Sequence, residues 1–135
     1  QAVAVGRGIP VLVEEDIVEM AFGALEGQLL SDFPACECIF SDPDLYVPLE
    51  GGESYAQLDV RCRKLLEEIL PPLEGRFHDV VLVSHGAFIR GVVCRVLDLP
   101  LKDFWDAPPQ PNCSCTVLEL KNGVCTLVEE GRVYG

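Results

Sequence analysis

Residues 79–86 read Asp-Val-Val-Leu-Val-Ser-His-Gly, an apolar run of strand length that ends in Ser84, His85 and Gly86. After them, apolar side chains recur at 88, 89, 92, 93, 96 and 97, the spacing of a helix with one buried face. The pattern therefore predicts a strand, a sharp turn at Gly86 and a helix. Because a helix N-terminus presents unpaired N–H groups and a positive dipole end, this junction is a candidate phosphate site, with His85 beside it.

A second helix is predicted to open at Ser54, a residue type that caps helices, and to stop at Pro71. Its apolar positions are 58, 62, 65, 66 and 69, again the spacing of one buried face. Near the C-terminus, residues 114–120 and 124–129 predict two strands. Asn-Gly in the connection between them is typical of a two-residue hairpin turn.

The N-terminal half has a less regular pattern. Residues 1–8 resemble the last turns of a helix closed by glycine, and residues 9–13 a short extended segment. Residues 14–27 contain too many glycines for a regular helix. Residues 29–52 are rich in Asp, Pro and Gly, which predicts an irregular excursion with about one helical turn and makes this segment a candidate lid.

Helices that alternate with strands, followed by a terminal hairpin, predict an α/β fold. We expect three layers, α/β/α, around a mixed and mostly parallel sheet. A chain of 135 residues suits one domain, and no internal repeat or second domain is visible, so the predicted domain spans residues 1–135.

Composition excludes several classes of protein. A hydrophobic fraction of 49% is too high for intrinsic disorder, and no stretch approaches the ~20 apolar residues of a membrane span. A net charge of -12 repels nucleic acid and anionic membranes, so we expect neither as a partner. Seven cysteines, an odd number, fit reduced thiols better than a disulfide framework and predict a cytoplasmic protein.

Two residues are candidates for chemistry at the phosphate site. A histidine after a strand is more often structural than catalytic, but the helix that starts beside His85 favours binding of a phosphoryl group. Cleavage of a phosphoester also needs a proton for the leaving oxygen. Glu19 is the leading candidate, because its apolar neighbours, Met20 and Phe22 among them, would favour a protonated carboxylic acid. The alternative is that Glu19 is one of many surface acids.

The cysteines raise one alternative from another class, a zinc-stapled interaction module. Cys36-x-Cys38 and Cys113-x-Cys115 are close pairs, but zinc sites usually leave two residues between paired cysteines. We therefore predict no metal site and no cofactor.

Three motifs in order resemble those of the histidine phosphatase superfamily, which includes phosphoglycerate mutases and α-ribazole phosphatases. They are Glu19-Met-Ala-Phe-Gly-Ala-Leu-Glu-Gly, Gly51-Gly-Glu-Ser with Arg61, and Val81-Leu-Val-Ser-His-Gly. The resemblance implies a phosphoglycerate mutase-like fold. It also implies that Glu19 is the general acid, that His85 binds the transferring phosphoryl group, and that Gly86 lets the backbone approach the phosphate.

The chain departs from that family at its start. Family members begin with a strand ending in Arg-His-Gly, whose histidine is the phosphorylated nucleophile, and no Arg-His-Gly occurs here. The family's first strands are thus missing from this chain, which alone we expect to be inactive. Two explanations stay open: a fragment of a longer polypeptide, whose missing segment or another chain completes the sheet, or a shortened homologue that binds phosphate compounds without turnover. The first is favoured, because a lost strand would leave unpaired backbone groups.

The expected function is that of a phosphomonoester phosphatase with a phosphohistidine intermediate on a histidine outside this chain. A phosphoglycerate mutase-type phosphotransferase is the alternative enzyme. From Gly8 through Val60 there is no Lys or Arg, whereas a mutase must also hold a carboxylate, so a small phosphorylated substrate with a less charged leaving group is preferred. Aromatic residues of the candidate lid, such as Phe40 and Tyr46, would pack on that group or simply cover the core.

Overall fold

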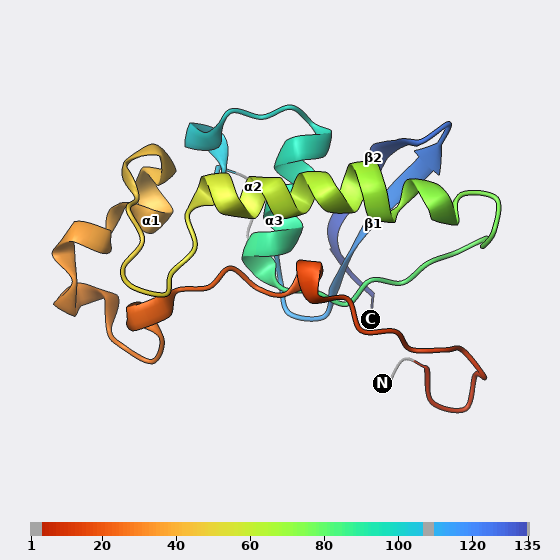
Figure 1. Cartoon of the computed structure of the whole chain (residues 1–135), viewed down its shortest axis with the longest axis horizontal. Coiled ribbons are helices and arrows are strands. Elements are labelled where there is room, and N and C mark those ends of the chain that lie inside the picture. Colours follow the sequence, from red (N-terminus) through yellow and green to blue (C-terminus); the bar gives the residue numbers. More distant parts are fainter. Residues whose placement is uncertain (1–3, 107–109, 135) are drawn as a thin grey trace.

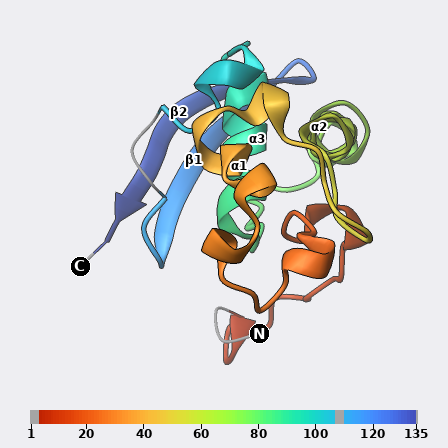
Figure 2. The ribbon, with the colours of Figure 1, turned by 90° about the vertical axis from the view of Figure 1, so that its left-hand side faces the viewer.

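Two helices and a hairpin form the body of the structure, a computed structural model that describes residues 4–106 and 110–134 (Figure 1). The helices are α2 (Tyr55–Lys64) and α3 (Gly86–Val96), and the hairpin strands are β1 (Ser114–Lys121) and β2 (Val124–Val133). Figure 2 shows α3 between the hairpin and α2. The facing sides of α2 and α3 supply half of the buried core, residues of the N-terminal half and the flanking segments supply the rest, and Leu118, Leu120 and Cys125 of the hairpin pack against it.

Helix α2 begins and ends as its sequence predicts. The Ser54 hydroxyl accepts a hydrogen bond from the Gln57 N–H, while the Gln57 side chain accepts one from the Ser54 N–H at 2.8 Å. This reciprocal capping box satisfies N–H groups that would otherwise lack partners at the helix start. The helix continues into one π-helical turn, Leu65–Ile69, and stops before Pro71, which has no N–H to donate.

Helix α3 starts directly after His85, which confirms the helix predicted from the apolar spacing. Its buried side carries Phe88, Val92 and Val93, all at most 6% exposed. At Gly91 the helix passes so close to α2 that an added Cβ would lie 2.8 Å from the Cys62 sulfur. Close approach of the two helices therefore depends on glycine at this position.

The C-terminal hairpin is also confirmed. Strands β1 and β2 pair antiparallel, with Leu118 opposite Leu127, and Asn122 and Gly123 both adopt positive φ at the turn. Positive φ at two consecutive positions is what a type I′ turn requires. The carboxylate of Glu74, which follows the α2 segment, accepts hydrogen bonds from the Asn122 and Gly123 N–H groups at 2.7 and 2.8 Å. The turn is thereby tied to the helical part of the fold.

The mixed, mostly parallel sheet of a three-layer fold is not present in the described part of the chain. Within residues 4–106 and 110–134 the sheet has only the two antiparallel strands of the hairpin. The run 79–84 is not a strand, and its Val81 and Val83 side chains are 71% and 73% exposed. A strand exists only when a neighbour accepts its backbone hydrogen bonds, so a strongly apolar run without one stays an extended segment.

The N-terminal segments are irregular. Residues 9–13 belong to no strand within the described ranges, and Leu12 is 88% exposed. Ala4 lies in a 3-10 helical turn, and residues 5–8 form the turn after it, with the Arg7 N–H bonded to the Ala4 carbonyl. Residues 1–3 of the predicted helix end lie outside the described residues.

The candidate lid is an irregular excursion, as predicted. It contains one α-helical turn, α1 (Cys38–Ser41), among short 3-10 helices at Leu30–Asp32, Pro34–Cys36 and Pro43–Leu45. Tyr46 is buried in the core, whereas Phe40 is 53% exposed and packs edge-on against Trp105, with ring centroids 5.4 Å apart. The indole N–H of Trp105 donates to the Ile39 carbonyl at 2.9 Å. The lid is therefore anchored to the loop that follows α3.

Further 3-10 helices complete the secondary structure at Glu15–Ile17, Gly23–Leu25, Pro71–Leu73 and Leu101–Asp103. Over the described ranges, every helix is too short or too polar to cross a membrane.

Candidate functional site

The Glu19 carboxylate lies at the N-terminus of α3. Its Oε2 accepts a hydrogen bond from the Ala87 N–H at 3.2 Å, and its Oε1 accepts one from the Phe88 N–H at 3.1 Å. The N–H of Met20 adds a third bond, at 2.9 Å. A Cβ placed on Gly86 would lie 3.9 Å from the same Oε2. The structure thus brings together two segments 67 residues apart in the sequence, as expected for a shared site.

This arrangement differs in one respect from the sequence-based expectation. Two of the helix N–H groups proposed for phosphate donate to Glu19 instead. The apolar surroundings expected for the carboxylate are also replaced by backbone donors, because the Met20 side chain turns into the core, where it is 1% exposed. Adjacent residues of an extended segment point to opposite sides, so a buried Met20 leaves Glu19 on the outer side.

His85 is exposed and lies at the junction between the extended run and α3. Its backbone is extended, with φ -130° and ψ 171°, and its ring caps none of the N–H groups at the described start of α3. The preceding residue is anchored, because the Ser84 hydroxyl donates to the Ile17 carbonyl. This bond holds the segment before His85 against the segment before Glu19.

Arg61 and Glu53 flank the Glu19 segment, an arrangement that sequence reasoning missed. Arg61 forms a two-pronged ion pair with Glu53: Nε donates to Oε1 and Nη2 donates to Oε2, each at 2.7 Å. Its Nη1 donates to the carbonyls of Asp16 and Val18 at 2.7 and 3.0 Å. The hydrogen bonds to Glu53 raise the pKa of Arg61 above its usual range, so its charge is permanent.

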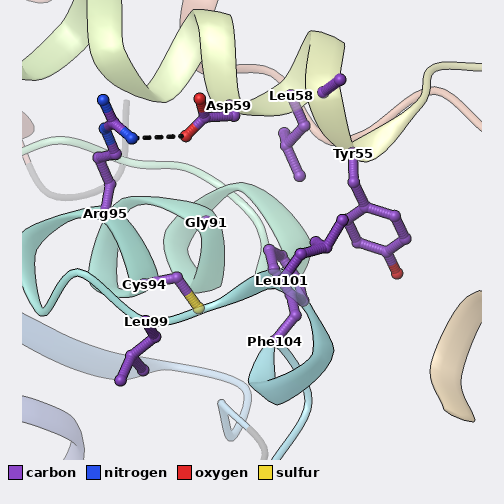
Figure 3. A pocket seen from close by; sticks show the side chains of 10 residues that line it. Tyr55, Leu58, Asp59, Gly91, Cys94, Arg95, Leu99, Leu101 and Phe104 are labelled. Carbon is purple, nitrogen blue, oxygen red and sulfur yellow. Dashed lines mark ion pairs between the residues drawn. The ribbon is translucent and has the colours of Figure 1, made fainter. Parts of the chain in front are cut away.

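Two surface hollows are lined by residues other than Glu19 and His85. The first, about 280 Å³, opens between α2 and α3 and is rimmed by an ion pair of Asp59 with Arg95 at 3.7 Å (Figure 3). The second, about 240 Å³, lies beside the candidate lid. Its lining is mostly apolar, with Glu26 as its one charged residue: Phe22, Leu25, Glu26, Gly27, Gln28, Leu30, Ile39 and Phe40.

The cysteine pairs considered for zinc form no metal site in the described ranges, where no three His, Cys, Asp or Glu side chains are grouped to hold an ion. Cys113 and Cys115 are exposed, and Cys36 is buried in the core. The two cysteine pairs therefore differ in solvent exposure and are far apart in the sequence.

The chain belongs to the histidine phosphatase superfamily (branch 1), whose family model matches residues 1–132. The matched range includes all three motifs that suggested the family. The phosphoglycerate mutase-like relationship predicted from three motifs is thereby confirmed.

Curated relatives and a solved structure support membership of the same family. Phosphoserine phosphatase 1 of Hydrogenobacter thermophilus is 28% identical over 107 residues, covering 76% of this chain and 50% of its own length. An acid phosphatase of Mycobacterium tuberculosis is 34% identical over 94 residues, 67% of this chain and 45% of its own length. The structure of YhfR from Bacillus stearothermophilus superimposes with a TM-score of 0.87 at 28% identity, covering 98% of this chain and 66% of that one. The chain spans 45% to 60% of the length of the curated relatives it matches.

Proposed function

We propose that the complete protein is a phosphomonoester phosphatase that works through a phosphohistidine intermediate, and that this chain supplies its general acid and one phosphate ligand. The observation that carries the proposal is the position of Glu19 at the start of α3, directly after His85; a phosphoryl group bound there would take over the Ala87 and Phe88 N–H groups and release the Glu19 carboxyl for proton transfer. Membership of the histidine phosphatase superfamily and the phosphatase names of its relatives support the same reaction class.

The reaction has two steps. A histidine outside this chain attacks phosphorus, the bond from phosphorus to the leaving oxygen breaks, and Glu19 gives that oxygen its proton. Water then attacks phosphorus, the bond to histidine breaks, and Glu19 takes the proton from the water. His85 donates a hydrogen bond to the phosphoryl oxygens, and Gly86, without a side chain, lets them approach the backbone.

The nucleophile is assigned outside the chain because Arg-His-Gly is absent from its sequence. We propose that residues 1–135 are part of one histidine phosphatase domain with a three-layer α/β/α fold. The extended runs 9–13 and 79–84, both apolar and exposed, would then be strand positions completed by a further segment of the polypeptide or by another chain. This pairing would remove their side chains from water.

The substrate is proposed to be a small phosphomonoester with an uncharged or weakly charged leaving group. Phe22, which lines the hollow beside the lid, lies three residues after Glu19, and three residues span at most about 11 Å. The hollow is therefore within reach of the leaving group. Its apolar lining carries Glu26 and no Lys or Arg, so a leaving group with a carboxylate or second phosphate would be disfavoured. This charge pattern favours the phosphatase over the mutase-type alternative.

The test is hydrolysis of p-nitrophenyl phosphate by the natural full-length polypeptide and its His85→Ala variant. We expect activity in the wild type and a loss of roughly 100-fold or more in kcat/KM for the variant. Equal rates would remove His85 from the mechanism. A wild-type protein that binds phosphate compounds without hydrolysing them would favour the other candidate, a non-catalytic homologue.

A further inference from the structure

We propose that Arg61 and Glu53 form a positioning pair that fixes the backbone around Glu19 and thereby aims its carboxylate. The proposal rests on the role of Glu19 as general acid in the proposed function. It concerns residues that would not touch the substrate and that act through Glu19 alone. Four separate contacts support it, two on each side of Glu19.

The first two contacts hold the chain before Glu19. The guanidinium Nη1 of Arg61 donates to the Asp16 carbonyl at 2.7 Å and to the Val18 carbonyl at 3.0 Å. Val18 is the residue immediately before Glu19, so its peptide plane is fixed directly by α2. A guanidinium that bridges two carbonyls in this way restrains both position and rotation of the segment.

The other two contacts hold the chain after Glu19. The Glu53 N–H donates to the Ala21 carbonyl at 2.7 Å, and the Ala21 N–H donates to Glu53 Oε2 at 3.4 Å. The Glu53 carboxylate also accepts hydrogen bonds from Nε and Nη2 of Arg61, so one ion pair joins the restraints on the two sides of Glu19. Loss of either side chain would break the ion pair and weaken the side-chain restraints on both sides, while the backbone bond between Glu53 and Ala21 would remain.

The pair also reaches the opposite side of the Glu19 carboxylate. The Arg61 guanidinium lies 5.0 Å from the centroid of the Phe88 ring, and the Phe88 N–H is one of the donors to Glu19. Arg61 thus contacts both the segment that carries the carboxylate and the helix residue that receives it. A cation over an aromatic face stabilises this arrangement.

Burial distinguishes this pair from an ordinary surface ion pair. The side chains of Arg61 and Glu53 are 18% and 13% exposed, whereas those of Arg63 and Asp59, paired on the same helix at 3.0 Å, are 47% and 39% exposed. Shielding from water strengthens the first pair, and the exposed second pair contributes little. Arg63 therefore offers a matched control two residues away.

The experiment compares two substrates of similar shape, p-nitrophenyl phosphate and phenyl phosphate, in the full-length protein. Phenolate is the stronger base, so its departure depends on the proton from Glu19, whereas p-nitrophenolate leaves readily without it. Lysine keeps the charge of Arg61 but cannot form the bidentate ion pair, and Glu53→Gln weakens the same pair by removing the charge of Glu53. For Arg61→Lys and Glu53→Gln we expect kcat/KM to fall roughly 10- to 100-fold with phenyl phosphate. With p-nitrophenyl phosphate we expect less than about a threefold change.

The ratio of the two rates does not depend on how much of the enzyme is folded, so partial unfolding would not imitate the expected result. Arg63→Lys should leave the ratio at its wild-type value. An equal loss on both substrates in Arg61→Lys and Glu53→Gln, or no loss, would overturn the positioning role. Glu19→Gln, measured in parallel, separates the two proposals. A wild-type ratio in Glu19→Gln would overturn both the general-acid role of Glu19 and the positioning role of Arg61 and Glu53. A changed ratio in Glu19→Gln, with wild-type ratios in Arg61→Lys and Glu53→Gln, would overturn only the positioning role.

Discussion

Gly91→Ala tests whether α2 and α3 truly touch where the structure brings them together. An alanine Cβ at this position would lie 2.8 Å from the Cys62 sulfur and 3.6 Å from Leu58. Cys62 is fully buried, and its thiol donates to the Phe88 carbonyl at 3.8 Å, so the sulfur has little room to turn away. The methyl group would therefore push α3, and with it the receiving end for Glu19, away from α2.

The size of the effect follows from two opposing contributions. Non-bonded heavy atoms favour separations of about 3.5–4.0 Å, so the new methyl overlaps the sulfur by roughly 1 Å. Overpacking of this kind costs about 1–3 kcal/mol, whereas alanine recovers about 1 kcal/mol of helix propensity relative to glycine. We expect a net loss of about 1 kcal/mol in the free energy of unfolding. Removing the sulfur with Cys62→Ala should abolish the overlap, because the methyl then fills the vacated space.

The assay is equilibrium urea unfolding of the full-length wild type, Gly91→Ala, Cys62→Ala and the double variant. We expect the double variant to be more stable than the sum of the single effects by at least about 1 kcal/mol. Additivity within about 0.5 kcal/mol would refute the reasoning, because it would mean that Gly91 and Cys62 are not in contact.

Three further predictions concern the hairpin and the thiols. Glu74→Ala should lower stability by about 1–2 kcal/mol, because two N–H groups of the hairpin turn lose their acceptor; an unchanged Tm would contradict this. Burial raises the pKa of the Cys62 thiol from its ordinary 9.0 to about 12, so iodoacetamide at pH 8 should label exposed Cys113 and spare Cys62, as read by peptide mass spectrometry. Above about pH 9 the Cys62 thiol loses its proton in the unfolded chain before it does so in the folded protein, so Tm should fall as the pH rises toward 12. The fall of Tm with pH should be less steep in Cys62→Ser, and an equal fall in both proteins would show that Cys62 is not its cause.

Local signals in the sequence predicted the helices and the hairpin. The cap at Ser54, the proline stop at Pro71 and the Asn-Gly turn act within a few residues, and each lies where it was expected. The run 79–84 was predicted as a strand and is not one here, because strand formation depends on a distant neighbour that local pattern does not supply.

The candidate site was predictable only in part. Motifs pointed to Glu19 and His85, but they did not indicate that the Glu19 carboxylate would bond to N–H groups of α3. They also gave no role to Glu53 and Arg61, whose contact follows from folding α2 against the segment before Glu19. The available signal was the motif Gly51-Gly-Glu-Ser with Arg61, which contains a pair of opposite charges, one just before the helix cap and one two turns into the helix. Such pairs are common on helices and do not by themselves mark a site.

In the proposed function, Glu19 and His85 serve one phosphoryl group at the start of α3. The most direct measurement is a crystal structure of the full-length polypeptide with vanadate, which adopts the geometry of a phosphoryl group in transfer. We expect vanadate oxygens within hydrogen-bond distance of the His85 ring and of the Glu19 carboxylate. Vanadate bound away from both residues, with Glu19 still on the Ala87 and Phe88 N–H groups, would contradict it.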